Sequence, residues 1–470
     1  MTDPTRYPIS RATGSKPEEM LDELQEPSHP TPRPLQRLRH LPSRVRHAIR
    51  CRLPLLAAYL WRRLMVRTTV IAVAGSVGKT TAKECLAAVL SDRARTLKTR
   101  NNENDAHGVP RTLLAIRPWH RFAVVEVGVG GPGDMKRLAR MVRPDIAIVL
   151  SVANTHTNNF RTLEATAAEK AQLLTFLTRR GTAILNADDE RVRSMAAGCR
   201  GSVLLFGQSA ECDFRAEEIA SRWPERLSFS VRHQDGVTPV RTLLVGTHWV
   251  GSVLAGLAAG AACGIPVAAF AERIAKVPPF AARMQPVVLP SGAVVVRDEE
   301  NGSEDTLNAM LKVLRESRAG RRILVLSDIS DSGAKQRKRQ RELGRIAGEL
   351  ADVAVFVSPH GGHARRAALE AGIDPSSCHH IPDLARAAEF LKCELRDGDL
   401  VFVKGRATDH LSRVVFAQYG SIGCWTTSCR IHRICDVCNL LQPGFDLDQA
   451  LSARAAVAPR LDCEPVRARR

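Results

Sequence analysis

The chain has 470 residues and a net charge of +19, and 44% of its residues are hydrophobic. This length and apolar content are typical of a soluble protein with about three domains. Aromatic residues make up only 4% of the chain, which argues against stacking surfaces for single-stranded nucleic acid, so we expect no nucleic-acid partner. An excess of Arg and Lys indicates either an anionic partner or an arginine-rich genome, and composition alone favours neither.

The first 68 residues are predicted to form a basic extension. Residues 1–43 are rich in Pro, Ser, Arg and Glu and have the composition of a disordered arm. Residues 44–67 form a basic amphipathic segment, predicted to pack on the next domain or to make peripheral contact with an anionic membrane. Its apolar stretch Leu53–Trp61 contains Pro54 and is too short to span a bilayer. No secretory signal is visible and the cysteines are mostly scattered, so we expect a cytoplasmic protein.

Two α/β domains and a tail are predicted after this extension. Residues 69–275 alternate apolar runs such as TVIAVAG, FAVVEVG and GTAILNAD with helical patterns, which indicates a P-loop-type parallel sheet. A similar alternation restarts at residues 276–418 and predicts a Rossmann-like C-terminal α/β domain. Residues 419–470 form a tail with clustered cysteines and little periodicity.

The stretch VIAVAGSVGKTTAKECL, residues 70–86, predicts a phosphate site. A strand, a tight glycine turn and a helix beginning at Lys79 direct backbone N–H groups and the helix N-terminus at an anion. The ammonium of Lys79 adds charge near the β- and γ-phosphates, and the hydroxyl of Thr80 suits Mg²⁺. The general P-loop pattern has a glycine where this chain has Val73, so GxxGKT is a shorter version of the motif. The predicted nucleotide-binding loop is Gly75, Ser76, Val77, Gly78, Lys79, Thr80 and Thr81.

Further polar residues lie close to predicted strand ends. Glu126 ends the apolar run VVEVG, where an unpaired carboxylate would be costly, so either a metal ion or a salt bridge is expected there. Asn102 and Asn104 follow the predicted second strand, and their amides are suited to phosphate oxygens or substrate.

The order of these blocks resembles the Mur ligase family. GSVGKTT is followed by NNENDAHGVPRTLL, VVEVG, MVRPDIAIVLSVANTHTNNF, AAEKAQLL and GTAILNADD. The likeness continues through GTHWVGSVLAGLAAG, RDEENGSEDTLNAML and VFVKGRATDHLSRVV, and covers about residues 69–416.

The resemblance implies an ATP-dependent ligase that joins a carboxylate to an amino acid or peptide through an acyl phosphate. ADP and phosphate are the expected products, and the expected process is the synthesis of a cell-wall or cell-surface polymer from a peptidoglycan-like precursor. It also implies that Lys79, His156 and Lys170 are catalytic. Thr80, Glu126, His156 and a carbamoylated Lys170 would bind Mg²⁺, with an ordinary exposed helix lysine as the alternative for Lys170. ATP contacts are implied for His248, Arg283 and Asp298, while Asn301 and Lys404 match positions near substrate or phosphate.

The sequence departs from the family at three places. Residues 1–68 are too short and polar for the N-terminal domain that binds a UDP-sugar in family members, which leaves the acyl donor open. Trp249 and Ser252 stand where the family usually has other residues. These changes raise the alternative of a nucleotide-binding regulatory or scaffold protein, whereas the basic charge raises that of a polynucleotide-stimulated ATPase.

The third departure is a group of four cysteines in the tail. Cys424, Cys429, Cys435 and Cys438 have the spacing C-x4-C-x5-C-x2-C. Four thiolates this close together can enclose one tetrahedral ion, so the tail is predicted to hold Zn²⁺ or an iron–sulfur cluster, with free thiols as the alternative.

Overall fold

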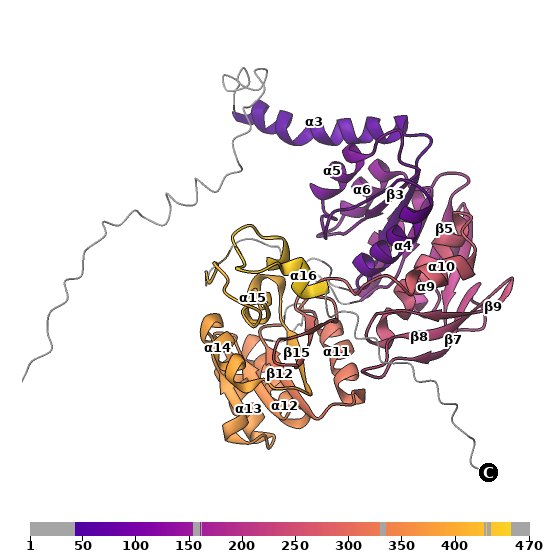
Figure 1. The fold of residues 1–470 in the computed structure, drawn as a ribbon. Coiled ribbons are helices and arrows are strands. Elements are labelled where there is room, and N and C mark those ends of the chain that lie inside the picture. The colour runs from indigo at the N-terminus through magenta and orange to yellow at the C-terminus, as the bar shows by residue number, and fades with distance from the viewer. Residues whose placement is uncertain are drawn as a thin grey trace, which may run out of the picture. The chain divides into compact units, whose positions relative to one another are not determined.

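The computed structural model describes residues 43–153, 160, 162–329, 335–426, 429 and 434–452. By its internal contacts the chain divides into residues 1–56 and a much larger compact unit, residues 57–470. The larger unit contains two β-sheets, each with helices packed against it, as Figure 1 shows. The α/β architecture predicted from the alternating patterns is therefore confirmed.

The first sheet has nine strands in the order β2-β3-β1-β4-β5-β6-β7-β8-β9. Pairings from β2 to β7 are parallel, while β7–β8 and β8–β9 are antiparallel. The bounds are β1 (Thr69–Ala74), β2 (Thr96–Lys98), β3 (Phe122–Glu126), β4 (Ile146–Val149), β5 (Thr182–Asn186), β6 (Ser202–Gly207), β7 (Phe214–Ala220), β8 (Ser228–His233) and β9 (Gly236–Arg241). The central strands are continuous apolar runs because helices cover both of their faces.

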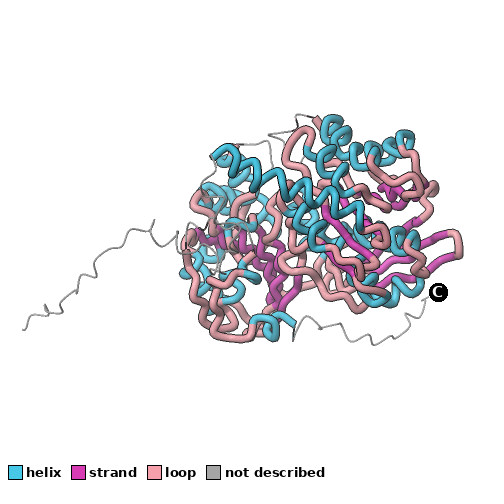
Figure 2. Tube along the Cα trace, turned by 90° about the horizontal axis from the view of Figure 1, so that it is seen from above, coloured by secondary structure: helices cyan, strands magenta, loops and turns pink. Residues whose placement is uncertain are grey.

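The helices of this region pack around this sheet. They are α4 (Lys79–Arg93), α5 (Gly108–Ala115), α6 (Asp134–Val142), α7 (Leu163–Thr175), α8 (Glu190–Ser194), α9 (Val250–Ala262) and α10 (Val267–Ile274). Leu86 of α4, Ile148 of β4 and Leu254 of α9 are fully buried in one core. Figure 2 shows the strands in magenta among these cyan helices.

The second sheet has six strands in the order β10-β11-β15-β12-β13-β14, and only the pairing of β10 with β11 is antiparallel. Its strands are β10 (Gln285–Val288), β11 (Val294–Asp298), β12 (Arg321–Leu326), β13 (Val353–Phe356), β14 (Cys378–His380) and β15 (Asp399–Lys404). Its helices are α11 (Glu304–Glu316), α12 (Gln336–Leu350), α13 (Gly361–Glu370), α14 (Leu384–Glu394) and α15 (Ser412–Phe416). The domain boundaries expected at residues 275 and 418 stay a prediction.

The basic segment before the first strand forms helix α3 (Ser43–Leu64). Its C-terminal part packs on loops next to the first sheet. The Trp61 indole N–H donates to the Ile116 carbonyl after α5 at 2.9 Å, and Arg62 pairs with Asp145 before β4 at 2.9 Å. The predicted packing is thus confirmed for this part of the segment. Contact of residues 44–67 with an anionic membrane stays a prediction. Within the described residues, no helix has the length and apolarity needed to cross a membrane.

The tail after α15 is mostly loop. It contains a short 3₁₀ turn, η6 (Cys435–Val437), and helix α16 (Leu447–Ser452). Ile422, Cys435 and Leu441 are buried in the core of the second sheet, so the described part of the tail is packed on the C-terminal domain.

Candidate functional site

The glycine loop connects β1 to α4 in a conformation that needs glycine. Gly75 has φ +150° and Gly78 has φ +84°. A Cβ atom on Gly75 would lie 2.9 Å from the Leu150 Cβ, and one on Gly78 would lie 2.6 Å from the Ser252 hydroxyl. Two hydrogen bonds fix the loop to Ser151 after β4, from the Ser76 N–H (2.9 Å) and the Val77 N–H (3.2 Å). The loop therefore holds the N-terminus of α4 open as an anion site.

Lys79 opens helix α4 and folds back over the loop. Its ammonium donates to the carbonyls of Gly75 at 2.8 Å and Ser76 at 3.2 Å. Burial lowers the pKa of Lys79, while the carboxylate of Glu126 acts in the opposite direction. Thr81 is 1% exposed, and its hydroxyl has no hydrogen-bond partner among the described residues. The arrangement places a cation and polar donors where a phosphate would lie.

Glu126 ends β3 beside this loop and is 1% exposed. The Thr80 hydroxyl donates to it at 3.0 Å, and the Asn104 amide donates at 2.7 Å. Lys83, which the sequence analysis did not single out, is fully buried and lies 3.4 Å from the same carboxylate. The salt bridge considered for Glu126 is thus present. The sequence shows only the spacing of Lys83, four residues after Lys79 on the same face of α4, and this spacing does not identify its partner.

The donor set around Glu126 also fits Mg²⁺. The Thr80 hydroxyl and the Glu126 carboxylate are hard oxygen ligands within hydrogen-bond distance of each other, and Mg²⁺ is commonly held by one or two such protein ligands plus substrate phosphates. Within the described parts of the chain, no group of three or more His, Cys, Asp or Glu residues is placed to hold a metal ion. A metal at Glu126 would therefore depend on phosphate oxygens for most of its coordination.

Of the two remaining predicted metal-site residues, one can be placed. His156 lies outside the described residues. Lys170 lies in the middle of α7 and is 3% exposed, so it is not an ordinary surface lysine. Burial, together with the positive charge of Lys79, lowers the pKa of Lys170 to about 7. A substantial fraction of this amine is therefore neutral near pH 7, the form that reacts with CO₂.

A cavity of about 290 Å³, here named the Trp249 pocket, lies on one side of the loop. Its lining includes Val77, Gly78, Asn186, His248, Trp249 and Asp298. The rings of His248 and Trp249 are 4.3 Å apart, and Trp249 is 6% exposed. Burial, assisted by the charges of Lys404 and Lys312, lowers the pKa of His248 to about 3, so this imidazole is neutral. The sequence analysis missed Asn186. It lines this pocket because it ends β5, and that strand end was the signal that could have identified it.

A second cavity of about 290 Å³, named the Arg283 pocket, lies next to Thr80. It is lined by Thr80, Asn102, Phe280, Arg283, Glu300 and Val437, among others. Glu300 accepts a hydrogen bond from the Asn102 amide at 3.0 Å and lies 3.5 Å from the Arg283 guanidinium. Burial raises the pKa of Glu300, and Arg283 opposes this. Glu300 was missed because it follows Asp298 and Glu299 in an acidic run with no motif.

Asp298 and Lys404 end two adjacent parallel strands, β11 and β15, and form a buried ion pair. The Lys404 ammonium also donates to the Asn301 carbonyl at 2.8 Å. Burial raises the pKa of Asp298 and lowers the pKa of Lys404, and each partner opposes the shift of the other. The structure therefore brings Asp298, Asn301 and Lys404 together, whereas Arg283 faces the other pocket.

The prediction of a zinc or iron–sulfur site in the tail is not supported. All four cysteines are described, are free, and form no metal-binding group. Cys435 turns into the core, where its sulfur lies 3.5 Å from His410 Nδ1. Burial raises the pKa of Cys435 to about 11. Because Cys435 is packed in this core, it does not converge with the other three thiols among the described residues.

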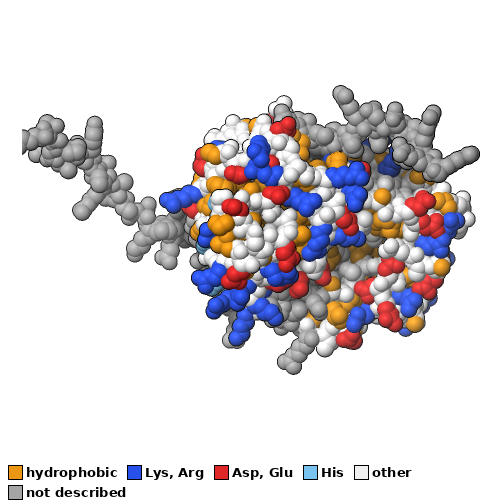
Figure 3. Space-filling model, turned by 90° about the horizontal axis from the view of Figure 1, so that it is seen from below, with side chains coloured by type: hydrophobic (Ala, Val, Ile, Leu, Met, Phe, Trp, Pro, Cys, Tyr) orange, Lys and Arg blue, Asp and Glu red, His pale blue; other side chains and the backbone are white. Residues whose placement is uncertain are grey.

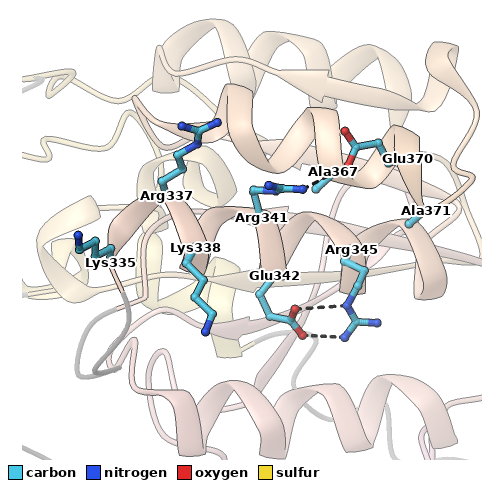
Figure 4. A pocket seen from close by; sticks show the side chains of 9 residues that line it. All are labelled: Lys335, Arg337, Lys338, Arg341, Glu342, Arg345, Ala367, Glu370 and Ala371. Atoms are coloured by element: carbon cyan, nitrogen blue, oxygen red, sulfur yellow. Dashed lines mark hydrogen bonds and ion pairs between the residues drawn. The ribbon is translucent and has the colours of Figure 1, made fainter.

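Another cavity, of about 600 Å³, lies away from these residues, between α12 and α13. Figure 4 shows its lining of long charged side chains, with Arg345 bonded to Glu342 and Arg341 directed at Glu370. It is an open surface groove, and none of the predicted site residues line it. Figure 3 shows other Lys and Arg side chains spread over one face with Asp and Glu between them, so we assign no chemistry to this groove.

Two family models match the chain. One, described as Mur ligase middle domain, matches residues 73–260, and the other, described as Mur ligase, glutamate ligase domain, matches residues 282–407. The first contains the glycine loop, Glu126 and Lys170, and the second contains Arg283, Asp298 and Lys404. The matched regions therefore include every site residue predicted outside the tail.

Curated proteins and solved structures agree with these matches. The UDP-N-acetylmuramoyl-tripeptide–D-alanyl-D-alanine ligase of Escherichia coli is 29% identical over 76% of this chain and 78% of its own length. The protein of the same name from Bacillus subtilis is 25% identical over 74% of this chain and 75% of its own length. A crystal structure of MurF from Acinetobacter baumannii superposes with a TM-score of 0.71 at 24% identity, covering 78% of this chain and 79% of that one. At this identity the structural likeness supports the fold.

Proposed function

Since the chain belongs to the Mur ligase family, whose members are ATP-dependent ligases that form C–N bonds, we propose that it joins a carboxylate to the amine of an amino acid or peptide. The observation that carries this proposal is the convergence of the glycine loop, Lys79, Thr80 and Glu126 at one edge of the first sheet. We place the reaction in the cytoplasm, in the synthesis of a cell-wall or cell-surface polymer.

The chemistry takes two displacements. A carboxylate oxygen of the acyl donor bonds to the γ-phosphorus of ATP as the bond to ADP breaks, giving an acyl phosphate. The amine nitrogen then bonds to the acyl carbon and releases a proton to water, while the carbon–oxygen bond to phosphate breaks. Phosphoryl transfer of this kind depends on alignment and charge neutralisation.

The residues of the chain are assigned roles in these steps. The N–H groups of the loop and the ammonium of Lys79 hold the phosphates. Thr80 and Glu126 would hold Mg²⁺, which supplies positive charge against the phosphate oxygens. Lys170, whose pKa is lowered to about 7, is proposed to carry a carbamate as a further anionic ligand. His156, which lies outside the described residues, stays a predicted metal ligand.

The nucleotide base is assigned to the Trp249 pocket. The Trp249 indole N–H is buried and has no hydrogen-bond partner among the described residues, so it can donate to the bound base or ribose. Ser252, the other departure from the family, donates to the Gly78 carbonyl at 3.2 Å and so supports the loop. These contacts give the regulatory or scaffold alternative no support.

The proposal is tested by a screen for phosphate release. Purified protein is incubated with ATP and Mg²⁺, with amino acids or dipeptides on one side and UDP-linked or polymeric carboxylates on the other. We expect ADP and phosphate to form only when both substrates are present, and mass spectrometry to show a new amide. ATP hydrolysis that ignores both substrates and gives no amide would overturn the proposal.

A further inference from the structure

The described tail is tied to the strand that carries the site carboxylates. Arg297, in β11, is fully buried and donates to both carboxylate oxygens of Asp436, at 2.8 Å each. The same guanidinium donates to Glu299 at 2.7 Å and to the Ser412 hydroxyl at 3.2 Å. Burial alone would lower the pKa of Arg297, but Asp436 and Glu299 raise it above its usual range. Arg297 therefore acts as a charged link between β11 and the tail.

The position of this link matters because of its neighbours in the sequence. Arg297 directly precedes Asp298, which pairs with Lys404. Glu300, which lines the Arg283 pocket, is three residues after Arg297. Asp436 directly precedes Val437, which lies in the same pocket. The buried ion pair between Arg297 and Asp436 thus fixes the position of the tail beside the site carboxylates. The tail itself lies beyond the family model, which ends at residue 407.

As a result, the tail supplies one wall of the Arg283 pocket. Ile434 and Val437 line it together with Phe280, and form an apolar surface. Thr80, Asn102, Arg283 and Glu300 line it with polar groups. An apolar surface with a few convergent polar groups is the usual composition of a small-molecule site.

The pocket has the charges and the size for an amino acid. Arg283 and Glu300 lie 3.5 Å apart and offer opposite charges to a carboxylate and an ammonium group. Its volume of about 290 Å³ is small for a nucleotide-linked peptide. Val77 and Gly78 line the Trp249 pocket, whereas Thr80 and Glu84 line this one. A ligand here would therefore lie on the phosphate side of the loop, opposite the nucleotide base.

We infer that Ile434 and Val437 form the wall that contacts the side chain of the amine substrate, and that this wall selects among amino acids or dipeptides by size. The inference rests on the proposed function. Asp436 is a positioning residue in this scheme, since it acts by holding Val437 in the pocket wall.

The test uses the full-length chain with Val437 replaced. Val437 is 45% exposed, so Val437→Trp is expected to leave folding intact and to fill the pocket. We expect the KM for the amine substrate to rise about tenfold or more, because overfilling a packed site is strongly unfavourable. The KM for ATP should stay within about twofold, since the base lies in the other pocket. Val437→Ala should shift the preference toward amines with larger side chains.

A matched control is Leu440→Ala. Leu440 is an apolar tail residue with 36% exposure that does not line the pocket, and its substitution should change neither KM. Asp436→Asn should reproduce the amine effect of Val437→Trp in part, with the protein still folded by circular dichroism.

The outcomes separate this inference from the proposed function. If the wild-type protein forms no amide with any substrate pair, the proposed function fails, and this inference with it. An active wild type whose Val437 variants behave like Leu440→Ala would overturn the inference alone. So would a rise in KM confined to the acyl donor, because the wall would then face the other substrate.

Discussion

The two sheets end in the same local arrangement, a buried lysine beside a carboxylate at the end of a parallel strand. In the first sheet Glu126 ends β3, and Lys83 lies 3.4 Å from it. In the second sheet Asp298 ends β11 and pairs with Lys404. All four residues are buried, so in each sheet the partner charge offsets the cost of burying the carboxylate.

The surroundings of the two pairs differ. Glu126 also accepts from the Thr80 hydroxyl and the Asn104 amide, next to the glycine loop. Asp298 accepts from the Met284 N–H at 3.2 Å and lines the Trp249 pocket together with Gly78. The comparison teaches that a buried ion pair does not itself specify a chemical role. The role follows from which other donors reach the carboxylate.

Lys79→Ala has the largest expected effect, because it removes the cation that folds over the glycine loop beside the first ion pair. We expect turnover to fall on the order of 10³-fold, since a preorganised positive charge at the transferred phosphate is lost. Initial rates of amide formation at saturating ATP measure this. Lys136→Ala, at an exposed position of α6, serves as the control. Ligation by Lys79→Ala at the control rate would contradict the site assignment.

The two ion pairs should differ in their contribution to stability. Asp298→Asn leaves Lys404 buried without its carboxylate, and should lower the free energy of unfolding by about 3–5 kcal/mol. Glu126→Gln should lower it by about 1–3 kcal/mol, because Lys83 retains Glu84 at 3.1 Å and the Thr99 carbonyl at 3.0 Å. Urea unfolding of both variants makes the comparison. Equal losses would show that the surroundings of the pairs are energetically equivalent.

Lys170 offers the smallest and most specific test, since it is a buried lysine whose pKa responds to the charge of Lys79. Its pKa is about 7 in the folded chain against an ordinary value of 10.5. Between these pH values the unfolded chain binds a proton that the folded chain does not, so folding stability should rise with pH across this window. Lys170→Met should reduce that rise in CO₂-free buffer. An unchanged slope would mean that Lys170 titrates normally.

The strands of the first sheet show what could be predicted from local pattern. β1, β3 and β5 are continuous apolar runs bounded by glycine or polar residues, and the sequence analysis located all three. Strands β7 to β9 were missed because they mix polar and apolar residues, and β9 even contains Pro239, which an edge strand tolerates. Patterning identifies strands that are buried on both faces better than strands that are partly exposed.

The sequence by itself determined the glycine loop, the lysine and threonine that open α4, and the carboxylate at the end of β3. Each of these depends on a few neighbouring residues and on the strand–turn–helix order, which local sequence specifies. Only the tertiary structure decided that Lys83 pairs with Glu126, that Cys435 turns into a core instead of toward other thiols, and that Asp436 meets Arg297. These contacts join segments that are distant along the chain, and their partners follow from the path of the backbone through both sheets.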